Sequence, residues 1–281
     1  LFLSIMNQNK RTLYENSESA AILKDVFAWF QTELDINYPN QPISDYSYLA
    51  QADADKVSEV CRIMSAFGTG ITDFRLRNVS IERVLHGLPK NLQDKIMAEI
   101  EQRQVKIRSN EQMKSVTMIL RTSANLFIII VNGTDEMKCQ TIEFCHGKKN
   151  VLFNLEEESD GTVRILDLLE ILLSGEGKTY VIDELDRCLH PSLSYKFVET
   201  FLNLAAEKNI QLIVTTHESR LMDFDLLRRD EIWFVNKRES GASDIYSLEE
   251  YNARFDQKID KAYLEGRYGG VPIFNTIFPV V

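Results

Sequence analysis

Residues Ser174–Pro191 read SGEGKTYVIDELDRCLHP and place a short apolar segment directly before a cluster of acidic residues. Tyr180–Ile182 has the composition of a buried parallel strand, so Asp183 and Glu184 stand at its carboxyl end. Ligands of open α/β sheets bind beyond the carboxyl ends of the strands. The stretch therefore predicts an α/β fold with a functional rim at these two carboxylates.

Helices and strands alternate around this stretch. The pattern predicts helices over 163–173 and 192–207, and strands over 179–182, 210–214 and 231–235, with a further helix before the last strand. Such alternation is typical of a parallel sheet with right-handed crossover connections. We expect one parallel sheet flanked by helices.

The second of these strands repeats the arrangement of the first. The sequence IQLIVTTHES ends its apolar run just before Thr215, Thr216 and His217. If the two strands are neighbours, His217 shares a rim with Asp183 and Glu184. Each residue alone is better explained as a turn cap or a solvated loop residue. In this order together, they favour nucleotide hydrolysis, with a Mg²⁺-binding Asp, a Glu that activates water, and a His that reaches a terminal phosphate.

The GKT at Gly177–Thr179 resembles part of a phosphate-binding loop but has the wrong context. The motif GxxxxGK[ST] needs a first Gly where this chain has Leu172, and it follows a strand and opens a helix. Here GKT follows a predicted helix and opens a strand, so Lys178 is predicted to be a turn residue. The motif is found nowhere in the 281 residues, and AFGTGITDF (66–74) is predicted to be a helix stop and turn.

Residues 1–112 are predicted to form a helix-rich insertion or arm. Apolar side chains recur at helical spacing over Leu23–Leu34, Val57–Met64 and Leu92–Ile100. The turn-forming stretch NYPNQPISDYSY (37–48) is predicted to be a loop.

Residues 113–281 are predicted to form the α/β lobe. Its first part contains SVTMILRT (115–122), NLFIIIVNG (125–133) and CQTIEFCHG (139–147), which read as three short strands separated by turn residues. We expect these strands to form an antiparallel meander.

Charge, apolar runs and cysteine spacing bear on nucleic-acid binding, membrane spans and zinc sites. The net charge is -10 with a pI near 5.1, so nucleic-acid binding stays open but gains no support from charge. The apolar run Leu126–Val131 is too short to span a membrane. The cysteines show no CxxC spacing, so we expect no zinc site and a reduced, cytoplasmic setting; they are Cys61, Cys139, Cys145 and Cys188.

Four motifs in order resemble those of ABC-type P-loop ATPases. YVIDE with LDRCLHP resembles the Walker B strand and D-loop, and TTHES resembles the switch-histidine segment. Upstream, LEEESDGTVRILDLL resembles a degenerate ABC signature at the start of a helix. With DLLRRDEIWFVNK and YLEGRYGGVP, the chain over 113–273 resembles the AAA-fifteen group of bacterial ABC-like ATPases, which includes abortive-infection and anti-phage subunits.

The resemblance implies ATP and Mg²⁺ as cofactors and gives roles to residues of the rim. Asp183 matches the Mg²⁺-binding Asp, Glu184 the catalytic Glu, Asp186 the D-loop Asp and His217 the switch His. The fold that it implies is a P-loop NTPase of the ABC-ATPase type.

The resemblance also implies an oligomer. Ser159 and Gly161 match signature positions that contact the γ-phosphate of ATP held by the other subunit. A hydroxyl group, backbone N–H groups and a helix N-terminus all favour an anion. Asp160 departs from the usual Gly-Gly of the signature. We expect a homodimer or higher homo-oligomer that closes around ATP and signals to an effector protein such as a nuclease.

The missing phosphate-binding loop is the main departure. In the family this loop precedes the helical insertion, so the resemblance implies a carboxyl-terminal portion whose loop lies before Leu1. The intact protein is expected to be an ATPase, and residues 1–281 alone to bind ATP weakly and be inactive. The alternatives are a metal-dependent nuclease that uses Asp183, Glu184 and Asp186, or a non-catalytic ATPase-like scaffold.

Overall fold

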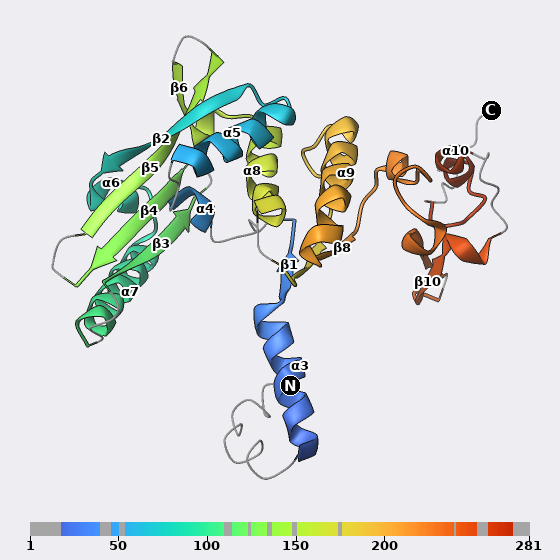
Figure 1. The fold of residues 1–281 in the computed structure, drawn as a ribbon, viewed down its shortest axis with the longest axis horizontal. Helices are drawn as coiled ribbons and strands as arrows, with labels where there is room; N and C mark the ends of the chain where they lie inside the picture. Colours follow the sequence, from blue (N-terminus) through green and yellow to red (C-terminus); the bar gives the residue numbers. More distant parts are fainter. Residues whose placement is uncertain are drawn as a thin grey trace, which may run out of the picture.

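The computed structural model contains a parallel sheet, a larger antiparallel sheet and a two-stranded hairpin (Figure 1). These sheets come from the part of the chain that the structure describes. The described ranges are 18–39, 46–50, 54–109, 114–122, 125–133, 137–147, 151–173, 176–238, 240–251 and 258–271.

The parallel sheet has the strand order β1-β7-β8. Its strands are β1 (Leu34–Asn37), β7 (Thr179–Ile182) and β8 (Gln211–Val214). Helix α9 (Pro191–Lys208) connects β7 to β8, and α8 (Asp160–Leu173) precedes β7. The predicted parallel pairing of β7 with β8 is confirmed.

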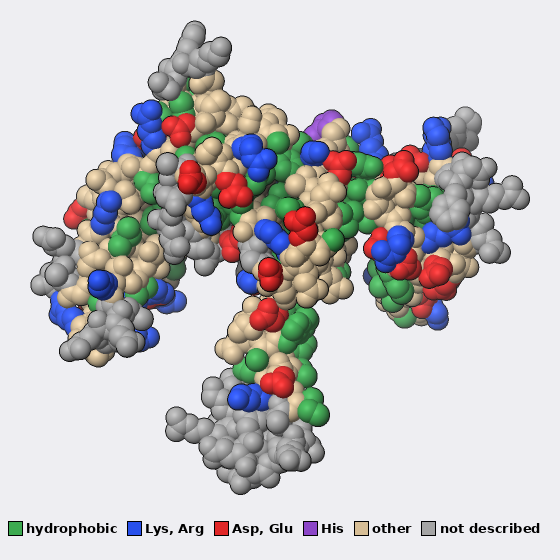
Figure 2. All heavy atoms as spheres, viewed as in Figure 1, with side chains coloured by type: hydrophobic (Ala, Val, Ile, Leu, Met, Phe, Trp, Pro, Cys, Tyr) green, Lys and Arg blue, Asp and Glu red, His purple; other side chains and the backbone are tan. Residues whose placement is uncertain are grey.

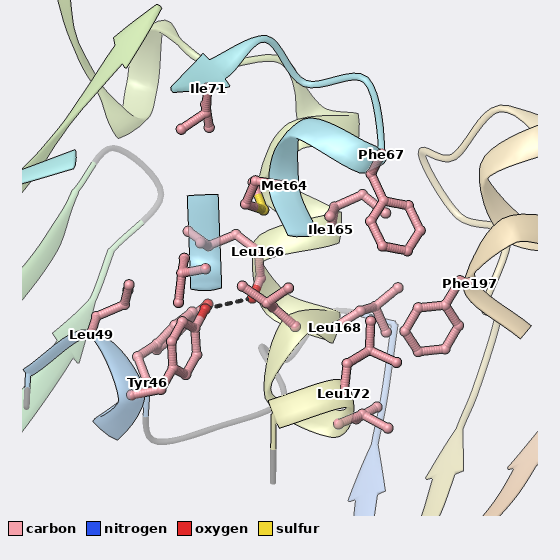
Figure 3. Close-up of a cluster of buried hydrophobic side chains, with 14 of the residues drawn as sticks. Tyr46, Leu49, Met64, Phe67, Ile71, Ile165, Leu166, Leu168, Leu172 and Phe197 are labelled. Carbon is pink, nitrogen blue, oxygen red and sulfur yellow. Dashed lines mark hydrogen bonds between the residues drawn. The ribbon is translucent and has the colours of Figure 1, made fainter. Parts of the chain in front are cut away.

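The side chains of α8 and α9 explain why these helices cover the sheet. Ile165, Leu168 and Leu172 of α8 and Phe197 of α9 meet in one buried cluster (Figure 3). Their spacing of three and four residues places them on one helical face. Tyr180 of β7 is buried against the same cluster.

The antiparallel sheet has the order β2-β5-β4-β3, with β6 also paired to β5. The predicted meander is confirmed by β3 (Ser115–Arg121), β4 (Leu126–Asn132) and β5 (Met137–His146). Two strands join it that the sequence pattern did not indicate, β2 (Ile71–Val79) and β6 (Val151–Asn154).

Helices cover both faces of this antiparallel sheet. On one face, α7 (Lys90–Ser109) and α6 (Ile81–Leu85) contribute to a cluster that includes Ile129. On the other face, α5 (Ala54–Ala66), α4 (Ser47–Ala50) and α8 belong to the cluster that includes Ile128. Adjacent residues of β4 thus enter different cores, because neighbouring side chains of a strand point to opposite faces.

The last part of the described chain has its own aromatic core around Phe234 and Tyr268. The strand predicted over 231–235 is present, but it pairs antiparallel with its neighbour and not with β8. The α-helix predicted before it is wrong, because two 3₁₀ turns stand there. The elements are η3 (Ser219–Leu221), η4 (Arg229–Glu231), β9 (Trp233–Lys237), β10 (Ser243–Ser247), η5 (Leu248–Glu250) and α10 (Ile259–Leu264), and η2 (Leu155–Glu157) precedes α8.

The described part of residues 1–112 contains the expected helices and also the strands β1 and β2. The three apolar stripes correspond to α3 (Glu18–Thr32), α5 and α7, although Leu34 lies in β1. Gly68 and Gly70 have φ angles of 73° and 76°, which confirms the predicted turn, but strand β2 starts directly after it. Because β1 pairs with β7 and β2 with β5, backbone hydrogen bonds cross the boundary at residue 112, which stays a prediction. Most of the loop predicted over 37–48 lies outside the described residues.

Helix α3 extends away from the sheets in Figure 1 and shows apolar side chains at its surface in Figure 2. Ile22 is 67% exposed and Phe30 is 50% exposed. Among the described helices, none is long and apolar enough to cross a membrane.

Candidate functional site

The carboxyl ends of β7 and β8 lie side by side. The two strands are parallel neighbours with Ile182 opposite Val214, so Asp183 and Thr215 are the next residues on each. The Thr215 hydroxyl donates a hydrogen bond of 2.6 Å to Asp183 Oδ1. On the other side, the Asp183 N–H donates to the Asn37 carbonyl of β1 at 2.9 Å. The predicted meeting of the two segments at one rim is therefore present.

Glu184 adopts a backbone conformation that is uncommon for its residue type. Its φ angle is 52°, in the left-handed region, which costs an L residue roughly 1–2 kcal/mol. Its N–H donates to the Thr215 hydroxyl oxygen at 2.9 Å, and its carbonyl accepts from the guanidinium of Arg164 at 3.2 Å and from the Arg187 N–H at 3.1 Å. These bonds hold the turn while the side chain stays partly exposed.

Asp186 connects the turn after β7 to the segment after β8. Its Oδ1 atom accepts a hydrogen bond of 2.7 Å from the Thr216 hydroxyl and one of 3.1 Å from the His217 N–H. The His217 residue is exposed. Asp186 thus fixes the backbone from which His217 extends, a contact that the order of motifs alone did not indicate.

The start of α8 lies beside the same turn. Ser159 caps the helix, because its hydroxyl oxygen accepts a hydrogen bond of 3.1 Å from the Thr162 N–H. A Cβ atom added to Gly161 would lie 3.2 Å from the Cys188 carbonyl oxygen. Gly161 therefore permits a close approach between the helix start and the turn after β7. Within the described residues, neither Ser159 nor Gly161 hydrogen-bonds to the rim carboxylates.

Two residues that the sequence analysis missed support this site. Arg164 is only 6% exposed, and its guanidinium donates to the Asn37 side-chain oxygen at 3.1 Å as well as to the Glu184 carbonyl. Burial lowers the pKa of Arg164, and the Asp167 carboxylate opposes that shift. A charged residue inside the apolar segment VRILDLL was the available signal for Arg164. Asn37 gave none.

Lys178 lies at the opposite end of the parallel sheet from the rim. It directly precedes β7, and its ammonium group donates to Asp35 Oδ2 at 2.8 Å. This hydrogen bond raises the pKa of Lys178. Gly177 before it has a φ of 83°. Lys178 thus follows a bend at Glu176 and Gly177, and its amino group forms an ion pair with Asp35 within the fold.

The side chains of the rim fit Mg²⁺ bound by a single carboxylate better than a metal ion bound by several carboxylates. Asp183 is a partly exposed carboxylate, the kind of oxygen ligand that Mg²⁺ takes, often with water and phosphate as its other ligands. Within the described ranges, no group of three or more His, Cys, Asp or Glu side chains is placed to hold a metal ion. Asp183, Glu184 and Asp186 are thus not grouped around one point, and the nuclease alternative gains no support from their placement.

A parallel sheet with helices packed on one face, and with acidic and hydroxyl side chains beyond its carboxyl ends, is consistent with the P-loop ATPase-like class. Residues 2–223 match the model of a family described as "AAA domain, putative AbiEii toxin, Type IV TA system". The match spans most of the chain, so the protein belongs to this AAA family. No curated protein matches the chain. The predicted P-loop ATPase-like class is supported, and the narrower AAA-fifteen group stays a prediction.

Proposed function

We propose that the intact protein is an ATPase and that the rim at β7 and β8 is its hydrolytic half-site. The observation that carries the proposal is the hydrogen-bonded connection between the two segments, Asp183 with Thr215 and Asp186 with Thr216. Such an arrangement fixes two acidic residues and the segment bearing a histidine at the edge where α/β proteins bind ligands. Membership of an AAA family supports ATP as the ligand.

Each rim residue has one role in this proposal. Asp183 would hold Mg²⁺, which neutralises charge on the phosphates when it is bound. Glu184 accepts a proton from the attacking water or orients it, which requires a carboxylate held in place. His217 contacts the terminal phosphate. Asp186 positions His217 through the backbone hydrogen bond described above.

The start of α8 is proposed to complete the site of a second subunit. Ser159 and Gly161 stand at the N-terminus of a helix of 14 residues, whose dipole and free N–H groups favour a phosphate. We propose a homodimer, or a higher homo-oligomer, in which each subunit gives this segment to the nucleotide of the other. Closure of the dimer would then signal to an effector protein, as in the AAA-fifteen group that includes anti-phage ATPase subunits.

Glu184→Gln in the intact protein tests the catalytic role. The amide keeps the shape of the side chain but cannot act as a base, so ATP turnover should be lost while Mg-ATP binding stays within about twofold. Glu199→Gln is the matched control, because Glu199 is a surface residue of α9 paired with Lys196. Turnover by Glu184→Gln within about tenfold of wild type would exclude Glu184 as the base. A wild-type protein without ATP turnover would overturn the proposed function itself.

A further inference from the structure

We infer that Arg164 is a positioning residue that holds Glu184 of its own subunit in the conformation needed for hydrolysis. The inference rests on the proposed function and adds a residue to that site. Arg164 belongs to the same helix as the signature segment, yet its guanidinium contacts the turn after β7. It is therefore placed to act on the catalytic carboxylate of the same chain, whereas Ser159 is proposed to act on the other.

The Arg164 guanidinium contacts backbone in a conformation that is unfavourable for an L residue. Glu184 has a left-handed φ of 52°, and the Arg164 Nη2 atom donates to its carbonyl at 3.2 Å. The Nη1 atom donates to the side-chain oxygen of Asn37 at 3.1 Å. Asn37 in turn accepts the N–H of Asp183 at its carbonyl. One planar group thus connects the ends of β1 and β7, which a Lys side chain with a single ammonium cannot reproduce.

Burying the Arg164 guanidinium has an energetic cost. Arg164 is 6% exposed, and its Nε atom has no hydrogen-bond partner within the described ranges. A buried donor without a partner costs roughly 1–3 kcal/mol. A hydrophobic side chain of similar length would avoid that cost. A charged fork at this position is therefore better explained by what it does to the turn than by its contribution to stability.

The first test compares catalysis with binding in the intact protein. Arg164→Met should lower kcat by at least about tenfold and leave the dissociation constant of Mg-ATP within about twofold, because only the position of the base changes. Arg164→Lys should recover part of the activity. Arg77→Met is the matched control, because it makes the same chemical change at an arginine of β2 that pairs with Glu143 and not with the rim, and its kcat should match wild type.

The second test asks in which subunit Arg164 acts. In mixed dimers, Arg164→Met subunits should partly restore activity with Ser159→Arg subunits, because one composite site then has an intact signature and an intact Glu184 turn. They should not restore activity with Glu184→Gln subunits, because every site then lacks a working base. The Ser159→Arg and Glu184→Gln mixture serves as the positive control.

The outcomes separate this inference from the proposed function. Full activity of Arg164→Met, or restoration with Glu184→Gln in place of Ser159→Arg, would overturn the role of Arg164 while the ATPase stands. An inactive wild type, or a positive control that stays inactive although mixed dimers form, would overturn the proposed function or its shared site. If Arg164→Met does not fold, as judged by circular dichroism, Arg164→Lys is carried through the same mixtures, and unreduced kcat in that variant counts against the inference.

Discussion

The two sheets of the molecule differ in how they are covered. Strand β4 of the antiparallel sheet is buried on both faces, with Ile128 and Ile129 each 0% exposed. The parallel sheet packs one face on α8 and α9, whereas Ile36 of β1 and Ile213 of β8 are each 50% exposed. Apolar burial stabilises a fold in proportion to the area removed from water. Strand β4 of the antiparallel sheet is therefore covered more completely than β1 and β8 of the parallel sheet, which carries the rim at its carboxyl edge.

Helix α8 joins these two regions. Its apolar side chains enter the largest buried cluster, in which Met64 of α5 and Phe67, the residue just after that helix, meet Ile165 (Figure 3). Arg164 contacts the rim of the parallel sheet, and Asp167 contacts Tyr46 beside α4. Because the side chains of a closely packed helix have few alternative arrangements, a shift of α8 at one sheet should also move its residues at the other sheet. The comparison predicts that rim substitutions change catalysis and core substitutions change stability.

The largest effect should come from filling the signature position. Ser159→Arg places a bulky side chain where a phosphate is proposed to bind, and turnover should fall by at least about a hundredfold. The variant should still fold because Ser159 is exposed, although loss of its cap on α8 should cost about 1 kcal/mol. Mixing these subunits with Glu184→Gln subunits should recover part of the activity, measured as phosphate release. Failure to recover any activity in proven mixed dimers would contradict a shared site.

Matched truncations test the difference in burial. Ile129→Ala in β4 should lower the free energy of unfolding by about 2–5 kcal/mol, because it leaves a cavity between the sheet and α7. Ile213→Ala in β8 is the same chemical change at a half-exposed site and should cost less than about 1.5 kcal/mol. Urea denaturation of both variants measures the two values. Equal losses would show that the parallel sheet is covered in solution.

Local sequence pattern predicted the elements that carry their own signals. Pro191 at the start of α9 and Asn209 at its end, with a φ of 52°, mark that helix from both sides. Strand β1 has only four residues and no such signal, so neither its place beside β7 nor the role of Asn37 was visible. For β9 the pattern identified a strand, but the pairing partner depends on tertiary contacts that a local pattern does not contain.

The part of the candidate site that was predicted also depended on local sequence signals. Asp183 and His217 follow apolar strands, and adjacency of those strands was sufficient to bring the segments together. The hydrogen bonds of Asp186 and the guanidinium of Arg164 depend on a turn and a helix packing side by side. Sequence alone did not show that geometry.

The smallest expected effect concerns the buried carboxylate between the two regions. Burial raises the pKa of Asp167, and the hydrogen bond that it accepts from the Tyr46 hydroxyl opposes the shift. A raised pKa in the folded state stabilises the fold at pH values below the unfolded pKa of about 3.9 and loses that contribution as pH rises through the folded pKa. Wild type should therefore lose a component of stability as the pH rises from about 4 toward 7.

Asp167→Asn removes that component, because an amide can still accept a hydrogen bond from Tyr46 but does not ionise. The difference in free energy of unfolding, variant minus wild type, should therefore increase with pH across this range. Tyr46→Phe makes the opposite change, since without the hydroxyl the pKa of Asp167 rises further and the stability of that variant should fall more steeply with pH. Urea denaturation at pH 4, 5.5 and 7 measures how the free energy of unfolding changes with pH in wild type and in each of the two variants. If Asp167→Asn and Tyr46→Phe both parallel wild type, ionisation of Asp167 does not contribute to stability over this pH range.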